Sequence, residues 1–284
     1  MVRPDSITER EYRRLTEIIR SETGIVFPQA KWTMIETRLA RRARALGVAD
    51  LSAYCQHLES PEGKRSETPY LVDAVTTHKT DFFREPAHFD YLAGQVVEEL
   101  ARHEGAGIRR PLLVWSAACS TGEEPYSVAM VLAGYAASVA PRPYRFRVEA
   151  SDVSAVVLET ARRAVYPESL IAPVPEPLRR RYILRSKDRG QAIVRIAPEI
   201  RACVFYRLLN LMDRDYGFRE PLDVVFCRNV MIYFDREAQQ QILSRIVDTL
   251  RPGGYLIMGH AESLTGVSLP LVQVTPTIYR RCDA

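Results

Sequence analysis

Polar side chains that can bind and orient a small charged ligand follow an apolar run near the end of the chain. The run at 222–226 stops at Arg228-Asn229, and Tyr233 follows in an Asn-x-x-x-Tyr pattern. Because parallel strands carry ligand sites at their carboxyl ends, this pattern predicts an active-site edge. Two upstream blocks, 76–85 and 115–127, also place charged and hydroxyl side chains beside apolar ones.

The elements that position these blocks alternate between strand and helix from Pro111 onward. Such alternation predicts an α/β fold with a doubly wound, mostly parallel sheet and helices on both faces. The tail at 271–281 predicts an antiparallel edge strand. The predicted strands are 112–115, 146–150, 203–209, 222–227 and 255–258. The predicted helices are 123–137, 154–164 and 236–250, the last of which precedes Pro-Gly-Gly at 252–254.

The sequence before this alternation is helical. Thr8 is a plausible N-cap for a first helix that Gly24 ends, and a second apolar face runs over 32–46 before Gly47. The stretch 60–64 predicts a loop. Within the sheet region, residues 182–184 and 192–196 flank a polar turn at 186–190, which predicts an inserted antiparallel hairpin.

These patterns predict a helical domain at 1–76, a linker helix with the start of the active site at 77–110, and a catalytic domain at 111–284 with an insertion at about 168–201. The chain has 284 residues, a net charge of +4 and five cysteines without C-x-x-C spacing, which argues against a disulfide framework or a zinc site. We expect a cytoplasmic protein, because the sequence has no leader and no long apolar run for membrane insertion.

Taken together and in this order, the three blocks resemble the chemotaxis-receptor glutamate methyltransferases, the CheR family. The resemblance spans almost the whole chain. It implies a Rossmann-like class I methyltransferase that uses S-adenosyl-L-methionine and releases S-adenosyl-L-homocysteine. The implied substrates are glutamate side chains in the cytoplasmic helical domain of chemoreceptor-type proteins, methylated by a monomer.

Acidic residues at the ends of the first two strands are the first candidates for cofactor binding. Glu124, or less favourably Glu123, follows the first strand and can pair with ammonium or hydroxyl groups. Its alternative role is to complement a helix dipole. Asp152 ends the second strand, where it either binds a ribose diol or caps the next helix.

The ends of the next two strands supply further candidates. Asn210-Leu211 ends the third strand and Arg228-Asn229 the fourth, and the resemblance implies that they read the adenine edge. Taken alone, Asn210 is typical of a turn residue.

The block at 76–85 adds side chains from outside the sheet. Arg84, flanked by aromatic residues, carries a planar fork that suits a carboxylate. The resemblance places it beside the cofactor and the acceptor acid, with Thr80 and His78 lining the same pocket. His78 stands where the family has an asparagine. The histidines at 57, 88 and 103 are interpreted as ordinary surface or packing residues.

Methyl transfer to glutamate requires neither a general base nor a metal, because the carboxylate is already an anion near neutral pH. We therefore predict catalysis by alignment. The resemblance makes Tyr233 the residue that orients the acceptor, with a packing aromatic as the alternative.

Substrate docking is assigned to a basic helix. Arg38, Arg41 and Arg42, with Arg44 nearby, can face acidic receptor helices. A solvated face or a nucleic-acid contact is the alternative. The hairpin loop keeps only Gly190 of the glycines that peptide-tethered relatives carry, which argues against tethering of a C-terminal receptor peptide.

Two rival functions differ from receptor methylation. A sequence pI near 8.8 and the basic helix favour an RNA or DNA methyltransferase. The sequence lacks an Asn-Pro-Pro-Tyr motif and an aromatic-interleaved basic stretch, so we expect no nucleic-acid partner. A non-catalytic scaffold that senses cofactor is the second rival, and joint retention of the candidate residues argues against it.

Overall fold

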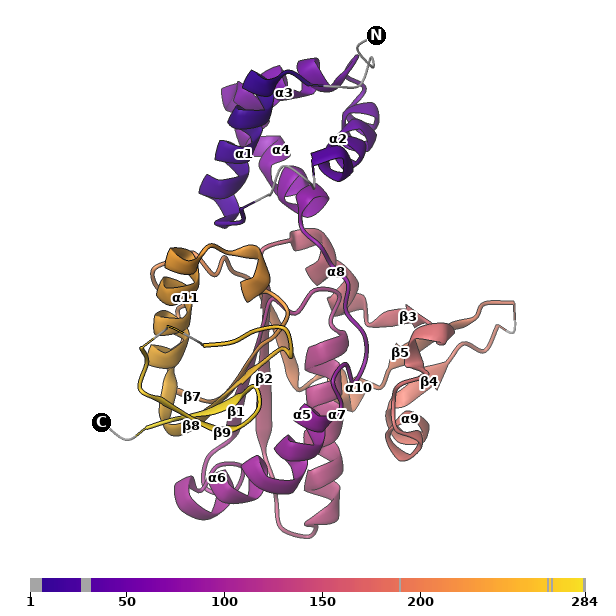
Figure 1. The fold of residues 1–284 in the computed structure, drawn as a ribbon. Helices are drawn as coiled ribbons and strands as arrows, with labels where there is room; N and C mark the ends of the chain where they lie inside the picture. The colour runs from indigo at the N-terminus through magenta and orange to yellow at the C-terminus, as the bar shows by residue number, and fades with distance from the viewer. Residues whose placement is uncertain (1–6, 27–31, 189, 265, 267, 283–284) are drawn as a thin grey trace.

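The computed structural model describes residues 7–26, 32–188, 190–264, 266 and 268–282 (Figure 1). Parts of the predicted regions lie outside these described residues, namely 1–6 and 27–31 of the helical domain, Arg189 of the hairpin turn, and 265, 267 and 283–284 of the catalytic domain.

A bundle of helices forms the N-terminal domain, above the sheet in Figure 1. Its helices are α1 (Glu9–Thr23), α2 (Trp32–Leu46), α3 (Leu51–Glu59) and α4 (Pro61–Val75). Thr8 caps α1 in a capping box with Glu11, and Gly24 ends the helix in the left-handed conformation. Both caps were predicted.

The predicted loop at 60–64 is wrong, because α4 begins there. Ser60 accepts a hydrogen bond from the Gly63 N–H, and Pro61 occupies the first helical position. Serine at the N-cap and proline at N1 are both helix-start signals. The glycine and proline content of the segment, taken alone, predicted a loop.

Short helices lead from this domain to the sheet: α5 (Ala87–Tyr91), the π-helical turn η2 (Leu92–Val96) and α6 (Val97–Glu104). The main sheet has the order β6-β2-β1-β7-β8-β10-β9. Its parallel strands are β1 (Leu112–Ala117), β2 (Phe146–Asp152), β6 (Val204–Leu208), β7 (Leu222–Cys227) and β8 (Leu250–Met258). The predicted doubly wound sheet is thereby confirmed.

Alternate residues of β1 enter different cores. Leu112 and Val114 pack with α7 (Glu123–Ser138) and α8 (Ala155–Arg163) on one face, whereas Trp115 packs with α11 (Arg236–Thr249) on the other. Figure 1 shows α11 and α7 on opposite sides of the sheet. Because both faces are covered, β1 and β7 are buried along their whole length.

The C-terminal strands differ from prediction in two details. Strand β8 begins at Leu250 and not at Tyr255, so the Pro-Gly-Gly segment lies inside the strand, beside a register shift opposite Leu222 and Val224. The tail forms a hairpin of β9 (Leu271–Thr275) and β10 (Ile278–Arg281), with β10 antiparallel to β8. A predicted single edge strand is therefore two strands.

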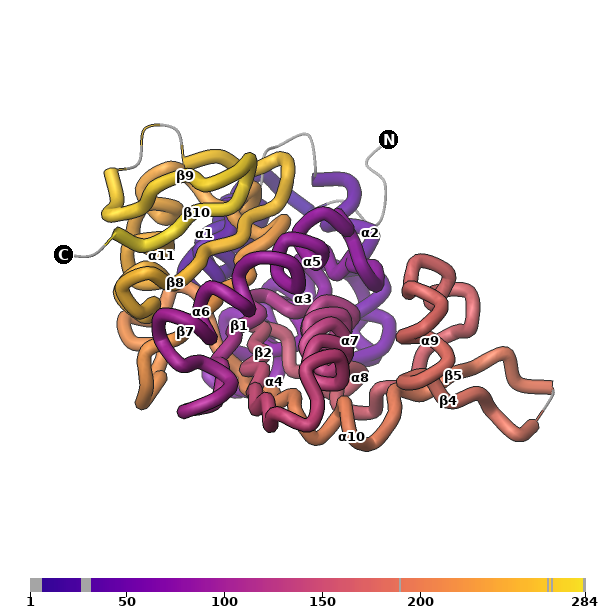
Figure 2. The backbone as a smooth tube through the Cα atoms, turned by 90° about the horizontal axis from the view of Figure 1, so that it is seen from below, coloured from indigo at the N-terminus to yellow at the C-terminus, as the bar shows by residue number. Residues whose placement is uncertain are grey.

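A second, smaller sheet projects from the main domain in Figures 1 and 2. It joins β3 (Val165–Pro167), β5 (Ile193–Ile196) and β4 (Ile183–Arg185) in that order. The predicted hairpin is β4–β5. Strand β3 was missed because three residues that include a proline are too short for a periodic pattern. The remaining short helices are η3 (Glu168–Ile171), α9 (Glu176–Tyr182), α10 (Pro198–Arg201) and η4 (Met231–Tyr233).

Within the described ranges, no helix combines the length and the apolar character needed to cross a membrane.

Candidate active site

A pocket lies over the carboxyl ends of β1, β2, β6 and β7 and encloses about 1090 Å³ with its open mouth. The N-terminal domain contributes Thr23, Met34 and Val75 to its wall. The pocket brings together every predicted cofactor-binding and catalytic residue: His78, Thr80, Arg84, Glu124, Asp152, Asn210, Leu211, Arg228, Asn229 and Tyr233.

Strained backbone surrounds this pocket. Non-glycine residues with positive φ include Phe83, Glu85, Ala118, Ser120 and Asn229, with φ between 51° and 58°. Each costs of order 1 kcal/mol or more and persists only where its surroundings hold it. Such residues gather at ligand sites, and here they come from the block before the sheet and from the ends of β1 and β7.

The end of β2 fixes the turn after β1. One Asp152 oxygen accepts the Ser120 N–H at 2.9 Å and the other accepts the Ser154 N–H at 3.0 Å. Burial raises the pKa of Asp152, and these backbone donors oppose the rise. Ser154 itself caps α8. The cap that was considered for Asp152 therefore belongs to Ser154, and Asp152 faces the pocket.

The two glutamates at the start of α7 have different surroundings. Glu124 lines the pocket and accepts the Ser116 hydroxyl at 2.7 Å. Glu123 is buried and turns back to the Thr121 hydroxyl. Burial raises the pKa of Glu123.

Arg228 links the strand ends to the block before the sheet. Its side chain is 2% exposed and pairs with Glu124 at 2.9 Å and Glu85 at 3.1 Å. It also donates to the Arg84 carbonyl. The Arg228 guanidinium thus holds the pocket wall through its two terminal nitrogens.

Arg84 is half-buried, and its two preceding neighbours, Phe82 and Phe83, are buried. Its guanidinium donates to the Lys79 carbonyl at 3.3 Å, which fixes one of its nitrogens near the pocket. An arginine has five N–H donors, so the fork retains donors for a carboxylate.

The Asn210 side chain is already occupied. Its oxygen accepts the Met212 N–H, and its amide donates to the Glu22 carbonyl of α1 at 2.5 Å. Asn210 therefore behaves as the turn residue that its type suggested and ties the two domains together. Leu211 is buried beside it.

His78 sits in a network of acids. Its Nε2 lies 2.9 Å from the Thr76 hydroxyl and 3.2 Å from Asp73 Oδ1. Burial lowers the pKa of His78, but Asp73 and Asp152 outweigh this effect and raise it. Asp73 also accepts the Ser154 hydroxyl, so the network joins α4 to the cap of α8.

Glu262 is a functional residue that the sequence reasoning missed. Its carboxylate accepts the N–H groups of Asn229, Val230, Met231 and Gly259, each at 2.8 Å. Burial raises the pKa of Glu262 against these donors. It shapes the loop between Asn229 and Tyr233. A lone glutamate after a strand gives no sequence signal for this role.

The predicted docking arginines Arg38, Arg41 and Arg42 are not among the residues that line the pocket, and their surroundings differ. Arg38 donates to the carbonyls of Ala74 and Thr76. Arg42 pairs with Glu67, which is 1% exposed, and covers the Tyr70 ring. Arg41 is exposed. The structure thus shows two of the three arginines engaged within the helical domain itself.

The doubly wound sheet and its acidic strand ends define the class as Rossmann-like methyltransferases that use S-adenosylmethionine. Two family models match the chain: "CheR methyltransferase, all-alpha domain" over residues 10–76 and "CheR methyltransferase, SAM binding domain" over residues 78–279.

Curated relatives agree with these matches. The chain is 38% identical to chemotaxis protein methyltransferase 2 of Pseudomonas aeruginosa, over 96% of this chain and 93% of the relative. It is equally similar to the chemotaxis protein methyltransferases of Salmonella typhimurium and Escherichia coli, at 38% identity over 96% of this chain and 91% of each relative. The chain therefore belongs to the CheR methyltransferase family. A solved glycopeptide N-methyltransferase matches with a TM-score of 0.34 and 15% identity over 68% of this chain and 59% of that chain, too distant for further argument.

Proposed function

We propose that this enzyme methylates glutamate side chains of chemoreceptor-type proteins, and that it acts as a cytoplasmic monomer. The observation that carries the proposal is the single pocket in which Arg84, Asp152 and Tyr233 meet. In this pocket Asp152 is the acid for a ribose. Arg84 and Tyr233 are the cation and the phenol for an acceptor carboxylate.

The pocket residues fit S-adenosylmethionine. Asp152 accepts the Ser120 N–H of the β1 turn on one oxygen and the Ser154 N–H of the α8 cap on the other, and it can accept from ribose hydroxyls as well, because each carboxylate oxygen accepts more than one hydrogen bond. We assign the backbone at Leu211 and Asn229 to the adenine. Thr80 and His78 line the same pocket. The cofactor supplies an activated methyl group on its sulfonium.

The chain's own contribution is alignment. An acceptor glutamate with a reference pKa of about 4.3 is anionic near neutral pH, so no proton has to be removed. Arg84 is assigned to hold this carboxylate and Tyr233 to orient its attacking oxygen. Glu262 and Arg228 fix the segments that carry these two side chains. Orientation of this kind is a recognised source of rate enhancement.

For receptor docking, only some arginines of the basic helix are exposed to a partner. Arg38 and Arg42 are engaged inside the helical domain, whereas Arg41 and Arg44 are exposed on α2. We assign the encounter with acidic receptor helices to these exposed arginines, without a tether to the receptor tail.

The test incubates the protein with tritiated S-adenosylmethionine and, separately, receptor cytoplasmic fragments, tail-truncated fragments and RNA. We expect base-labile label on both receptor forms, as methyl esters give. The Tyr233→Phe variant should bind cofactor but label slowly. Label on RNA would favour the rival enzyme, and loss of label on tail truncation would assign docking to the β4–β5 hairpin.

A further inference from the structure

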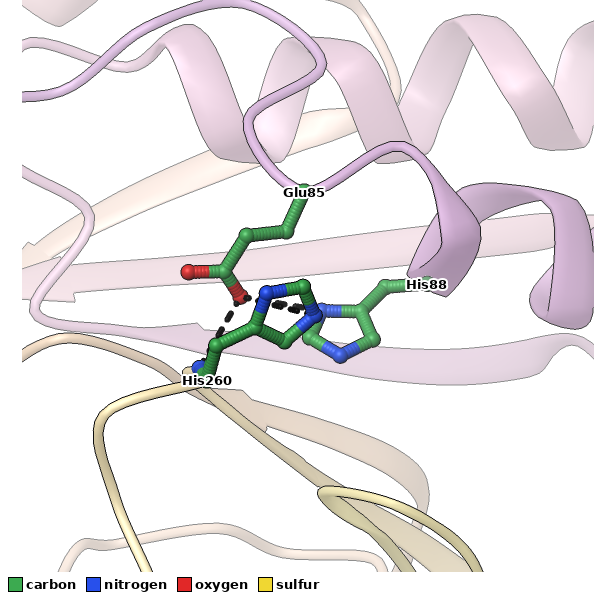
Figure 3. Close-up of side chains that lie close together, drawn as sticks. All are labelled: Glu85, His88 and His260. Atoms are coloured by element: carbon green, nitrogen blue, oxygen red, sulfur yellow. Dashed lines mark hydrogen bonds and ion pairs between the residues drawn. The ribbon is translucent and has the colours of Figure 1, made fainter.

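A group of metal-binding side chains lies behind the pocket wall. Glu85, His88 and His260 place their ligand atoms within 4.8 Å of one another (Figure 3). They come from the turn before α5, from α5 itself and from the segment after β8. His88, interpreted from the sequence as a surface or packing histidine, is buried inside this cluster.

The hydrogen bonds around His88 decide where its proton lies. The Thr277 hydroxyl donates to the Pro276 carbonyl at 2.6 Å, so its oxygen is left to accept from His88 Nε2 at 2.8 Å. Nε2 therefore carries the hydrogen. In the neutral ring, Nδ1 then carries a free lone pair. Nδ1 is buried and has no hydrogen-bond partner among the described residues.

This lone pair faces a carboxylate. His88 Nδ1 lies 3.5 Å from Glu85 Oε2, and the His88 side chain is 3% exposed. The same Glu85 oxygen also accepts from Arg228 at 3.1 Å and from the His260 N–H at 3.2 Å. The His88 Nδ1 lone pair has no such donor among the described residues, and a cation between it and Glu85 would satisfy both acceptors.

His260 completes the set from the solvent side. Its Nε2 is 3.9 Å from the same Glu85 oxygen, its ring meets that of His88 edge to face, and its side chain is 61% exposed. An exposed ring can turn to shorten these distances and leaves an entry path. Two imidazoles and one carboxylate form a ligand set that suits Zn²⁺ and similar divalent ions.

We propose that Glu85, His88 and His260 bind one divalent transition-metal ion of the Zn²⁺ type, through Glu85 Oε2, His88 Nδ1 and His260 Nε2, with a fourth position open to solvent. Thr277 is the outer-shell partner that fixes the His88 tautomer. The ion fastens the turn before α5 to the end of β8 and takes no part in methyl transfer.

The neighbouring arginine is compatible with such an ion. Arg228 contacts Glu85 at 3.1 Å, but it also pairs with Glu124 at 2.9 Å. Its charge therefore stays balanced when Glu85 turns to the metal.

The test titrates tag-free, chelator-treated protein with Zn²⁺ and with Co²⁺ as a spectroscopic probe. We expect one ion per chain and a Co²⁺ spectrum of nitrogen and oxygen ligands. His260→Ala and His88→Ala should each lose the site. His103→Ala, an equally exposed histidine elsewhere, should not.

Thr277→Val tests the outer shell. It keeps a β-branched side chain at this positive-φ position but removes the acceptor, and it should weaken binding roughly 10–100-fold. The proposal is overturned if wild type binds no Zn²⁺, if His260→Ala binds as wild type does, or if the Co²⁺ spectrum shows thiolate ligation. Because His260 is exposed, its replacement leaves the fold available for the comparison.

Discussion

Arginines in two regions of the molecule share a residue type but differ in surroundings. At the edge of the sheet, Arg228 is buried between two carboxylates that are each 13% exposed. On α2, Arg41 faces water, while Arg42 one residue later is held by a buried glutamate. An arginine in a motif can therefore support the fold or meet a partner, and burial of its partner separates these roles.

The largest effect should come from breaking the buried arginine at the sheet edge. Arg228→Ala leaves Glu85 and Glu124 without their cation and should cost about 3–5 kcal/mol of unfolding free energy. Urea denaturation measures the loss. Arg41→Ala is the matched control and should change stability by less than about 0.5 kcal/mol. Equal losses of unfolding free energy in the two variants would contradict the distinction between the buried and the exposed arginine.

A smaller loss is expected on α2. Arg42→Ala leaves Glu67 unpaired and should cost about 2–3 kcal/mol. The double variant Arg42→Ala with Glu67→Leu should recover most of that loss, because no buried charge remains. If Arg42→Ala alone is as stable as wild type by urea denaturation, this arginine is free to dock a receptor after all.

Cofactor binding tests the acid at the end of β2. Asp152→Asn replaces one acceptor oxygen with an N–H₂ group and should weaken adenosylhomocysteine binding by about 1.5–3 kcal/mol. Calorimetry gives the affinity. Glu123→Gln, in a neighbouring acid that turns away from the pocket, is the control and should bind normally. Unchanged affinity in folded Asp152→Asn would limit Asp152 to holding the Ser120 turn.

The exposed arginines should have a modest effect on receptor methylation. Reversing Arg41 and Arg44 to glutamate should raise the receptor KM and flatten its salt dependence, at less than about 1 kcal/mol per charge. Cofactor affinity, measured in parallel, should stay constant. A KM that does not change at low salt would move docking away from α2.

The smallest expected effect is on pH dependence. The pKa of His78 is raised in the folded state, so its contribution to stability is present below about pH 6.5 and is lost as pH rises through the folded value. The difference in unfolding free energy between wild type and His78→Asn should therefore shrink toward alkaline pH. His88 titrates alike in both proteins and cancels. A difference that grows with pH would contradict the raised pKa.

Much of the fold could be predicted because its signals are local. Apolar runs gave the strands of the main sheet, and Thr8 with Gly24 gave the ends of α1. Strand β3 and the start of α4 were not predicted. A three-residue strand is too short to show a hydrophobic periodicity, and a Ser-Pro pair can be interpreted as a break between helices.

The residues of the candidate site likewise divide into those with a local sequence signal and those without one. Residues at strand ends were identifiable, since parallel strands gather their carboxyl ends at one edge. Glu262 and Thr277 could not be identified, because their roles depend on contacts between segments far apart in the chain. Glu262 accepts N–H groups more than thirty residues earlier along the chain, from Asn229 to Met231, and Thr277 reaches His88 across 189 positions.

Both domains contribute residues to the pocket wall. Thr23 and Val75 of the helical domain line it together with the sheet residues, and the Val26 N–H donates to the Tyr233 carbonyl at 3.1 Å. A partner that reorients this domain changes cofactor affinity by some factor, and the bound cofactor must change affinity for that partner by the same factor.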